Sequence, residues 1–430
     1  MSPRRRRSDG PDPHTGGPSR FPLVTAADAL AVLRRFRALP AEDVAVADAV
    51  GRVLARDVRT TMDLPHFARS YMDGYAVRAR DTESASDTQP AHLAVVGSVR
   101  MGHPVRRRLA AGEAMRIPTG GMLPAGADAV VMVEHTHEDE DGVVAIAHAA
   151  KRGQHVMRRG EDAPRGARIF PRGHRLRPAD VGALSGIGRS RVRVVRRPRV
   201  AVIATGDEIV GPDVTPRPGQ VRNVNQYALR ALITAAGGDP VDLGVLPDRE
   251  AVITRALRRA LATADAVLLS GGSSVGTKDL TPAVVARMPR ARLLVHGIRI
   301  KPGKPTLIAR AAGKPVIGLP GNPTSALVIF EVFAVPLIRR LAGEPDAAAF
   351  APRRAVPAAL AEAIPSATGR EDWVRVALTP GADGGLVARP VAGGSGDIVS
   401  FIRADGLVRV PADAAELAAG AAVTVRLVAS

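Results

Sequence analysis

The chain has 430 residues, 46% of them hydrophobic, and its 60 Lys and Arg outnumber 42 Asp and Glu, giving a net charge of +18. This length predicts two to four domains rather than one core. No apolar run reaches the roughly 18 to 20 residues of a membrane-spanning helix, and no apolar stretch follows the arginine cluster at residues 4–7, so we expect no secretory signal peptide. Cysteine is absent, which excludes disulfides, thiolate nucleophiles and Cys-based metal sites and favours the cytoplasm.

Positive charge is concentrated in two arginine-rich stretches, residues 4–7 and 189–199. A strongly basic chain raises nucleic-acid binding as a hypothesis. Against it stand an aromatic content of 3%, which leaves little to stack on unpaired bases, and the lack of zinc-finger, helix-turn-helix or ribonucleoprotein patterns. We therefore interpret the charge as a solvated surface or as attraction for an anionic small substrate, with nucleic acid as the weaker alternative.

The first half of the chain predicts a tail, one helix and a β-rich region. Residues 1–20 are rich in Pro, Gly and Arg and are predicted to be disordered. Thr25 and Asp28 form a capping-box pattern that opens an amphipathic helix. From Val44 to about Arg196 the pattern is one of short strands and turns.

From Arg199 to about Gly343 strands alternate with helices. Apolar strands are expected at RVAVIAT, PVDLGVL, DAVLLS, ARLLVHGIRI, TLIAR and PVIGL, and helices near residues 227–236, 249–262 and 281–288, with a long helix at the end. This alternation predicts a parallel sheet with right-handed crossovers, in which ligands bind outside the carboxyl ends of the strands. Residues from about 352 to 430 return to short strands and predict a small β-barrel or sandwich.

Glycine-rich turns follow two of these strands. The turn after DAVLLS can bring backbone N–H groups and serine hydroxyls close to an anion. The turn after PVIGL ends in Asn322, a good N-cap, and Pro323, which fits the first helical position, so the positive end of a helix dipole would face the same rim. The candidate anion-binding residues of both turns are Gly271, Gly272, Ser273, Ser274, Gly276, Pro320, Gly321 and Asn322.

Lysine is rare in this sequence, which makes the heptapeptide IKPGKPT unusual. It holds Lys301 and Lys304, two of only five lysines, whereas arginine supplies the other 55 basic residues. The prolines and the glycine stiffen the loop, and a lysine ammonium acts as a compact point charge toward oxyanions. We predict an oxyanion site here, the alternative being two solvated lysines.

Three carboxylates, Glu208, Asp248 and Asp279, follow strands of the same sheet. Carboxylates beside an anion site would repel the substrate unless a cation lies between them, and Mg²⁺ bridges carboxylate and phosphate oxygens in this way. The sequence therefore predicts a Mg²⁺ site, but not which carboxylates bind the metal directly. Taken alone, Asp248 could equally be the N-cap of the helix that follows it.

Seven motifs, in this order, resemble the molybdopterin molybdenumtransferase family, the MoeA group that includes the C-terminal domain of gephyrin. They are SYMDGYAVR, RIPTGGMLPAGADAVV, RRGEDAPRGARIFPRGHRL, ATGDEI, LLSGGSSVGTKD, IKPGKPT and GLPGNPTSAL. The resemblance runs from about Phe21 to the end of the chain and is weaker after Gly343.

The resemblance implies a multidomain α/β plus β fold in four parts. A discontinuous linking domain would comprise residues 21–62 and 165–197, and an inserted β-rich domain residues 63–164. A molybdopterin-binding α/β domain with a mostly parallel sheet would comprise residues 198–345, and a C-terminal β-barrel residues 352–430. The resemblance also implies a homodimer with the active site across the subunit interface, to which the loops around Asp73, Thr119 and Asp162 would contribute.

Members of this family insert molybdate into adenylylated molybdopterin and release AMP in a reaction that requires Mg²⁺. The resemblance therefore implies that Glu208, Asp248 and Asp279 hold Mg²⁺ and that the two loop lysines hold oxyanions. It leaves open whether a molybdopterin adenylyltransferase docks here. A tungstate-preferring insertase or a non-catalytic molybdopterin-binding scaffold would share these residues.

This chain departs from the family pattern at three points. Some members have a lysine where this chain has Gly297, and Arg299 is the candidate replacement for its charge. The usual SGGVSVG reads SGGSSVG here. A serine is expected near the cleft in the last domain, and both Ser395 and Ser400 fit its pattern.

Overall fold

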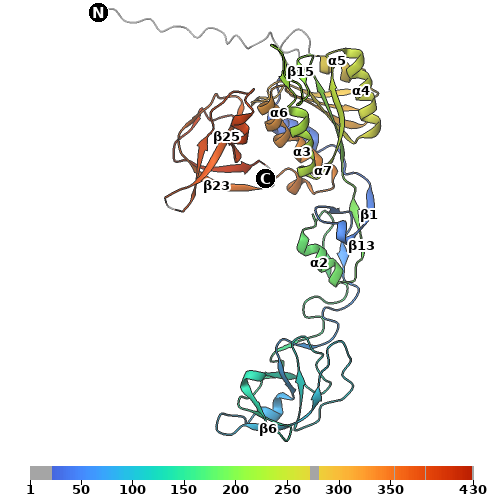
Figure 1. Cartoon of the computed structure of the whole chain (residues 1–430), viewed down its shortest axis with the longest axis vertical. Coiled ribbons are helices and arrows are strands. Elements are labelled where there is room, and N and C mark those ends of the chain that lie inside the picture. Colours follow the sequence, from blue (N-terminus) through green and yellow to red (C-terminus); the bar gives the residue numbers. More distant parts are fainter. Residues whose placement is uncertain (1–21, 272–279, 353, 383, 429–430) are drawn as a thin grey trace, which may run out of the picture. The chain divides into compact units, whose positions relative to one another are not determined.

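The computed structural model describes residues 22–271, 280–352, 354–382 and 384–428. Their contacts divide the chain into two compact units. One comprises residues 22–55, Gly173–Arg177 and the described residues from Arg191 onward, and the other comprises Arg56–Arg172 and Pro178–Ser190. Figure 1 shows the elements of both units, which are described separately below.

The first unit is built on a six-stranded mixed sheet with the order β17-β14-β18-β22-β21-β19. Neighbours from β17 to β22 pair in parallel, whereas β21 is antiparallel to both of its neighbours. The predicted, mostly parallel sheet is thus confirmed, with one reversed strand near its edge. The strands are β14 (Arg199–Thr205), β17 (Asp239–Leu246), β18 (Ala266–Ser270), β19 (Arg292–His296), β21 (Leu307–Ala311) and β22 (Lys314–Leu319).

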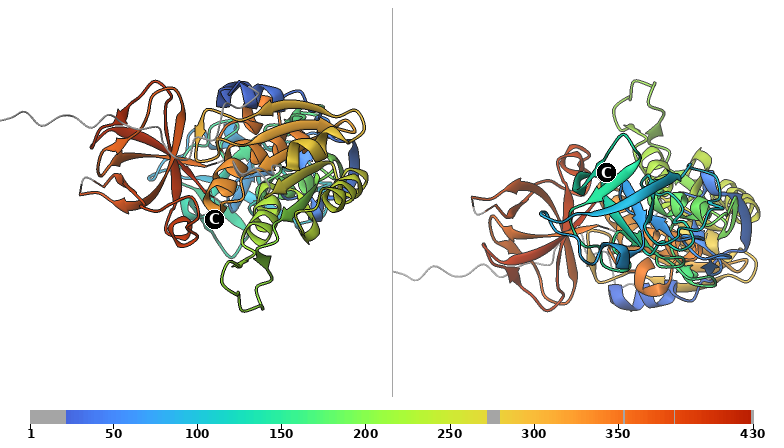
Figure 2. Two further views of the ribbon diagram at one scale, coloured as in Figure 1. Left: turned by 90° about the horizontal axis from the view of Figure 1, so that it is seen from above. Right: turned by 90° about the horizontal axis from the view of Figure 1, so that it is seen from below.

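Helices cover both faces of this sheet (Figures 1 and 2). Alternate residues of β14 enter two cores: Val200 and Val202 belong to one, Ala201 and Ile203 to the other. The first core also contains residues of α1 (Ala26–Leu33), α3 (Asn225–Ala236), α6 (Pro323–Ile329) and α7 (Val335–Leu341). The second contains residues of α4 (Glu250–Thr263) and α5 (Leu280–Ala286). The sheet is therefore the middle layer of three.

Local sequence signals account for the helix ends. The predicted capping box is confirmed, because the Thr25 hydroxyl accepts from the backbone N–H of Asp28 at 3.1 Å while the Asp28 carboxylate bonds back to Thr25. Helix α3 ends at Gly237, whose φ of 93° is in the left-handed region that favours glycine. The predicted long last helix is one run, α6 to α7, with a π-helix at Phe330–Ala334 in its middle.

A closed β-barrel forms the last part of the first unit. Its strand order is β25-β26-β23-β29-β27, and β27 pairs back to β25. The strands are β23 (Ala355–Leu360), β25 (Glu371–Pro380), β26 (Leu386–Pro390), β27 (Gly406–Val410) and β29 (Ala422–Leu427). Leu407 of the barrel belongs to the same core as α6 and α7. The predicted barrel is confirmed, and it is packed against the α/β part rather than tethered to it.

Short elements complete the first unit. A three-stranded sheet joins β1 (Ala41–Ala45), β13 (Arg191–Val195) and β2 (Val53–Leu54). Strands β15 (Ile209–Val210) and β16 (Val221–Arg222) belong to an arm that projects from the α/β part in Figure 2. The remaining elements are β20 (Ile300–Lys301), β24 (Ile364–Pro365), β28 (Glu416–Leu417), α8 (Asp346–Ala349) and α9 (Val399–Ile402).

The second unit is β-rich. Its six-stranded sheet has the order β8-β5-β7-β6-β10-β9. These strands are β5 (Gly74–Val77), β6 (Ala91–Ser98), β7 (Glu113–Ile117), β8 (Ala129–Met132), β9 (Thr136–Glu138) and β10 (Val143–Ile146). Two strand pairs and a helix accompany them: β3 (Val58–Arg59) with β12 (Arg168–Phe170), β4 (Arg69–Ser70) with β11 (Val156–Met157), and α2 (Pro178–Gly186).

Residues of the predicted linking domain are found in both units. Helix α1 packs in the core of the α/β part through Ala29 and Leu33, and β13 pairs with β1 in the first unit. Helix α2 belongs to the second unit. The four domain boundaries inferred from the resemblance stay a prediction. Among the described residues, no helix is long and apolar enough to cross a membrane.

Candidate active site

Four turns that follow parallel strands meet at one rim of the α/β sheet. The N–H of Asp248, after β17, donates to the carboxylate of Asp207, after β14, at 3.2 Å. The side-chain amide of Asn225 donates to the Ser270 hydroxyl at 2.8 Å and to the carbonyl oxygen of Gly321 at 2.7 Å, which joins α3 to the ends of β18 and β22. Sequence reasoning predicted the rim but missed Asn225, because no motif or hydrophobic pattern marks this residue at the start of α3.

Gly271 shows why glycine is required at this rim. Its φ is +118°, and a Cβ atom there would lie 2.2 Å from the carbonyl oxygen of Thr205. The turns after β18 and β22 are close to each other here, since a Cβ on Gly321 would lie 3.8 Å from the Cα atom of Gly271. Of the predicted anion-binding residues, Gly272, Ser273, Ser274 and Gly276 lie outside the described residues, as does the candidate metal ligand Asp279.

Carboxylates and unpaired oxygens at the rim suit a hard cation. The buried Oδ1 atom of Asp248, Oγ1 of Thr205 and Oδ1 of Asn225 have no hydrogen-bond partner among the described residues. No described group of three His, Asp or Glu side chains could enclose a metal by itself. Mg²⁺, however, is often held by one or two carboxylates together with substrate phosphates and water. The oxygen donors at the rim fit Mg²⁺ bound in that shared way.

Two residues at the rim, Asp248 and Asn322, were candidate helix N-caps, and the structure distinguishes them. Asp248 does not cap the helix that follows it: α4 has Arg249 at its N-cap, without a side-chain cap bond. Asn322 is the N-cap residue of α6 by position, with Pro323 after it, but its side chain makes no cap bond. The Asn322 amide instead donates to the hydroxyl of Ser395 at 3.0 Å. Asn322 therefore joins the rim to the barrel.

The lysine loop lies on one wall of a cleft of about 890 Å³. Strand β20, which begins the loop, pairs in parallel with β25 of the barrel, in the register Ile300 with Glu371 and Lys301 with Asp372. Gly303 has a φ of +113°, and a Cβ on it would lie 2.3 Å from the Ile329 side chain, so the turn between the lysines is fixed against α6. Both Lys301 and Lys304 line the cleft and are exposed.

The barrel supplies another part of the cleft lining, including charged residues that sequence reasoning missed. Arg370, Asp372 and Arg375 of β25 and its approach line the cleft together with Arg299 of the loop. The described part of the chain thus lines the cleft with five cationic side chains and one carboxylate, that of Asp372. The charged residues of REDWVR were the available sign in the sequence that this segment contributes to a site. The sequence does not reveal that the segment lies beside a loop some 70 positions away.

Arg375 connects three segments at the cleft by hydrogen bonds. The residue is 8% exposed, and its guanidinium donates to the hydroxyl of Thr324 at 3.2 Å, to the carbonyl oxygen of Gly393 at 2.5 Å and to the hydroxyl of Ser400. Burial lowers the pKa of Arg375, and the charge of Asp397 partly offsets this. A buried cation whose direct acceptors are neutral raises the positive potential of the cleft.

The structure distinguishes the two candidate serines of the last domain. Ser395 lines the cleft, accepts from Asn322, and its carbonyl oxygen accepts from the N–H of Thr324 at 3.1 Å. Ser400 is 7% exposed, does not line the cleft, and accepts from Arg375. Ser395 is therefore the cleft serine, and Ser400 supports Arg375.

The missing lysine at position 297 has a steric reason. Gly297 has a φ of +89°, and a Cβ on it would lie 2.5 Å from the side chain of Leu23. A lysine would be strained there and would displace Leu23. Arg299, two residues later, is exposed and lines the cleft, as its proposed role requires. Lys314 is different from the loop lysines, because its ammonium donates to the carbonyl oxygens of Leu261 and Ala264 at 2.6 and 2.7 Å and caps α4.

In the second unit, Asp73 and Thr119 are in contact. The backbone N–H of Thr119 donates to the Asp73 carboxylate at 2.6 Å, and this bond holds the pKa of Asp73 below its ordinary value, with help from the Thr119 side chain. The backbone N–H of Arg158 donates to Glu161 and lowers the pKa of its carboxyl group. The Tyr71 hydroxyl, which donates to the same carboxylate at 2.9 Å, lowers this pKa further. Asp162 follows Glu161, and its N–H donates to the carbonyl oxygen of Leu64 at 3.0 Å.

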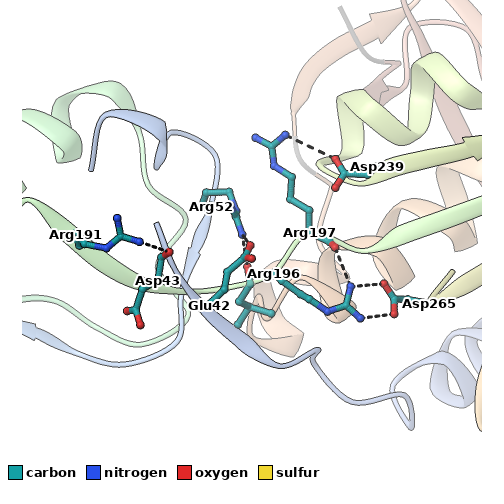
Figure 3. A network of polar contacts seen from close by, with 9 residues as sticks. Glu42, Asp43, Arg52, Arg191, Arg196, Arg197, Asp239 and Asp265 are labelled. Carbon is teal, nitrogen blue, oxygen red and sulfur yellow. Dashed lines mark hydrogen bonds and ion pairs between the residues drawn. The ribbon is translucent and has the colours of Figure 1, made fainter. Parts of the chain in front are cut away.

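The arginine-rich stretch 189–199 is occupied by internal contacts (Figure 3). Arg196 makes two bonds to Asp265, at 2.7 and 2.5 Å, and Arg193 bonds Asp43 at 2.7 Å. Arg197 lies 3.9 Å from Asp239. Arg196 and Arg197 link the end of β13 to the α/β sheet, whereas Arg193 pairs with Asp43 of β1. Three of the six arginines in this stretch thus face a carboxylate, and the structure gives the nucleic-acid hypothesis no support.

Three family profiles match the chain in order. They are described as "MoeA N-terminal region (domain I and II)" for residues 24–188, "Probable molybdopterin binding domain" for residues 201–340 and "MoeA C-terminal region (domain IV)" for residues 357–428. The barrel with the Arg370 wall thus lies in the third profile and the lysine loop in the second.

Named relatives and a solved structure agree with these profiles. A protein named molybdopterin molybdenumtransferase 2 from Mycobacterium tuberculosis (strain ATCC 25618 / H37Rv) is 35% identical over 394 residues, 90% of this chain and 95% of the relative. A molybdopterin molybdenumtransferase from Nostoc sp. is 38% identical over 296 residues, 68% of this chain and 67% of the relative. The crystal structure of a molybdopterin biosynthesis MoeA protein from Pyrococcus horikoshii OT3 matches with a TM-score of 0.83 and 30% identity, covering 95% of this chain and 100% of that one.

Proposed function

Since the chain belongs to the MoeA family of molybdopterin molybdenumtransferases, we propose that it inserts molybdate into adenylylated molybdopterin and releases AMP in a Mg²⁺-dependent reaction. It is a transferase of molybdenum cofactor biosynthesis, and its substrate is a molybdopterin. The adenylylated form of the substrate, the Mg²⁺ and the cytoplasmic location are parts of the proposal.

The observation that carries this proposal is the charge of the cleft. Among the described residues that line it, five are cationic, Arg299, Lys301, Lys304, Arg370 and Arg375, and one is a carboxylate. Molybdate is a small dianion, and a partly enclosed cationic cleft attracts such an ion more strongly than an open surface does, because fewer water molecules screen it. The volume of about 890 Å³ leaves room for an organic substrate beside the oxyanion.

The loop and the barrel would act on the oxyanion by positioning it. The Lys301 and Lys304 ammonium groups offer several N–H donors from a turn that Gly303 and Ile329 hold in place. Ser395 adds a hydroxyl on the cleft wall, fixed by Asn322. Because the backbone of the loop and the Ser395 hydroxyl are held before the substrate binds, only the lysine side chains need to adjust when charge develops on the reacting oxygens.

The rim of the sheet would hold the phosphate end of the substrate. Bound Mg²⁺ would neutralise phosphate charge and make the bond to the AMP leaving group easier to break. Asp248, with its unpaired buried Oδ1 atom, and Glu208 of the neighbouring turn are the described carboxylates proposed to hold this ion. Asn225 joins the ends of β18 and β22, and Gly271 lies against Thr205 at the end of β14, so the described ends of these three strands are held together. No enzyme nucleophile is needed, and the absence of cysteine is consistent with sulfurs that belong to the substrate.

The experiment that tests the proposal is AMP release from adenylylated molybdopterin by the purified full chain with Mg²⁺. Molybdate and tungstate are titrated in parallel, and a reaction without either oxyanion is the control. Molybdate-dependent release is the expected result. Release that responds only to tungstate would identify a tungstate-preferring insertase, and tight binding without release would identify a molybdopterin-binding scaffold; either outcome would overturn the proposal.

A homodimer with its active site across the subunit interface, and docking of a molybdopterin adenylyltransferase, are also proposed on the basis of the family. Light scattering measures the first directly: a mass near twice 44.9 kDa is expected. If the homodimer completes the site, mixing a strongly impaired Lys304→Ala chain with a strongly impaired Asp73→Asn chain should restore activity by forming mixed dimers. Restoration is absent if each chain holds a complete site of its own.

A further inference from the structure

Among the described residues, one carboxylate lines the cleft, and the proposed function gives it no task. It belongs to Asp372, which lies on β25 with 4% of its surface exposed. A buried carboxylate is unfavourable unless cations or N–H donors compensate it. In a cleft for oxyanions it also repels the ligand. Its position therefore requires an explanation.

Each oxygen of Asp372 faces a different cation. The Nε atom of Arg370 donates to Oδ1 at 2.9 Å, and the Nζ atom of Lys301 lies 4.0 Å from Oδ2. The two cations come from different parts of the fold, since Arg370 precedes β25 of the barrel and Lys301 lies on β20, beside the α/β sheet. The pairing of β20 with β25 brings Lys301 and Asp372 together, because the two residues are partners in the strand register.

The two contacts differ in strength, and the difference has a chemical consequence. Arg370 uses only Nε for Asp372, which fixes the plane of the guanidinium and leaves its terminal N–H groups available to another acceptor. Lys301 is at the limit of an ion pair and its side chain is 62% exposed, so its ammonium can move to a ligand at little cost.

We propose that Asp372 is a positioning residue that orients Arg370 and Lys301 toward the oxyanion in the cleft. This inference rests on the proposed function of the cleft as an oxyanion site and adds a residue to which no role has been given. Asp372 does not touch the oxyanion; it acts through the two cations. It also lets the barrel and the α/β part contribute one cation each to a single ligand.

The test uses the full chain with molybdate as the probe, measured by calorimetry, together with the KM for molybdate and the kcat in the AMP-release assay. Asp372→Asn keeps the side-chain shape but removes the charge. We expect roughly tenfold weaker molybdate binding and a similar rise in the KM for molybdate, because one well-oriented charged hydrogen bond contributes about one order of magnitude to affinity. The KM for adenylylated molybdopterin should stay unchanged.

The matched control is Glu371→Gln, which removes one negative charge from the adjacent residue of the same strand. Glu371 pairs with Arg409 at 2.9 Å and does not line the cleft. Its loss should leave molybdate binding unchanged. A second measurement combines Asp372→Asn with Arg370→Ala: if Asp372 acts mainly through Arg370, the Asp372→Asn effect should largely disappear in the Arg370→Ala background.

Several results would overturn the inference. Tighter molybdate binding by Asp372→Asn would mean that the carboxylate only reduces the charge of the cleft. Equal weakening of both substrates with a lower unfolding temperature would assign Asp372 a purely structural role. Additive effects of the two substitutions would break the link to Arg370. Failure of the proposed function itself is distinguishable, since the unsubstituted chain would then bind no molybdate.

Discussion

Two positively charged regions of this chain differ in how far carboxylates compensate their charge. The stretch 189–199 carries more cations than the loop 300–306, but three of its arginines face Asp43, Asp239 and Asp265, and Figure 3 shows the contacts of Arg196 and Arg197. The lysines of the loop face a cleft that the described residues line with one carboxylate. Charge density in the sequence therefore does not identify a binding site. What matters is whether the fold brings counter-charges to the cations.

The largest effect should come from removing a cation in the cleft. Lys304→Ala is expected to reduce kcat/KM for molybdate by about 100-fold, the scale seen when one preorganised donor to a developing charge is lost. Kinetics at saturating adenylylated molybdopterin and varied molybdate measure it. Lys151→Ala, which removes an exposed lysine of the second unit, is the matched control. Equal activities of the two variants would show that the loop lysine is only solvated.

A smaller effect, on stability alone, is expected in the arginine-rich stretch. Burial raises the pKa of Asp265, but the hydrogen bonds from Arg196 and the N–H of Arg199 outweigh it, so its folded-state pKa is below the ordinary value. The carboxylate therefore stabilises the fold above its unfolded pKa near 3.8, and this contribution is lost as the pH falls through the lower folded pKa.

Asp265→Asn should accordingly reduce the free energy of unfolding by about 2 kcal/mol at pH 7, less than a fully buried pair would lose. The difference from the unsubstituted chain should shrink below pH 3.8. Urea unfolding at several pH values measures both, and activity per folded molecule should not change. Asp43→Asn is the control, because its pair with Arg193 is half exposed and should contribute at most about 0.5 kcal/mol. A difference independent of pH would contradict the role of the charge.

Lys314 offers a comparison within the rare lysines. Lys314→Met removes the two bonds to the last carbonyls of α4 and should cost roughly 1 kcal/mol of stability. The KM for molybdate should be unaltered, in contrast to Lys304→Ala. Thermal unfolding and the AMP-release assay together check this. A changed KM would place Lys314 in contact with the site.

The smallest effect is expected for Arg197→Gln. Arg197 and Asp239 are 3.9 Å apart and about half exposed, so their separation should change stability by less than about 0.5 kcal/mol. Arg197 lines a smaller cleft of about 450 Å³, to which the described residues contribute both acidic and basic side chains. Titration with a short DNA duplex at low salt, before and after the substitution, should show no specific binding. Binding that Arg197→Gln weakens would revive the nucleic-acid hypothesis.

Much of the α/β part could be predicted because local patterns are strong there. The strands, the capping box at Thr25 and the glycine after α3 follow from residues within a few positions of one another. The reversed strand β21 could not be predicted, since a short apolar strand reads the same in either direction. The π-helix at Phe330–Ala334 was likewise not predicted, because the apolar pattern of the run from α6 to α7 does not mark it.

The candidate site was predictable on one wall only. The stiff turn between Lys301 and Lys304 is encoded within one heptapeptide, so the loop could be identified without the fold. Arg370, Asp372 and Arg375 could not, because their role depends on the pairing of β20 with β25. The same holds for the choice between Ser395 and Ser400, which the contact of Asn322 decides.

Local patterns in the sequence predicted the layered α/β arrangement, the short strands of the last part and the two rare lysines in a rigid turn, because periodicity, capping and turn chemistry act over short distances. The seven motifs indicated the family, and with it the choice of a barrel over a sandwich. Tertiary structure alone decided which charges remain available. Asp265 compensates Arg196 across 69 positions, and Asp372 meets Lys301 across a gap of similar length. Electrostatic compensation depends on distances in space, and chain folding sets those distances independently of separation in sequence.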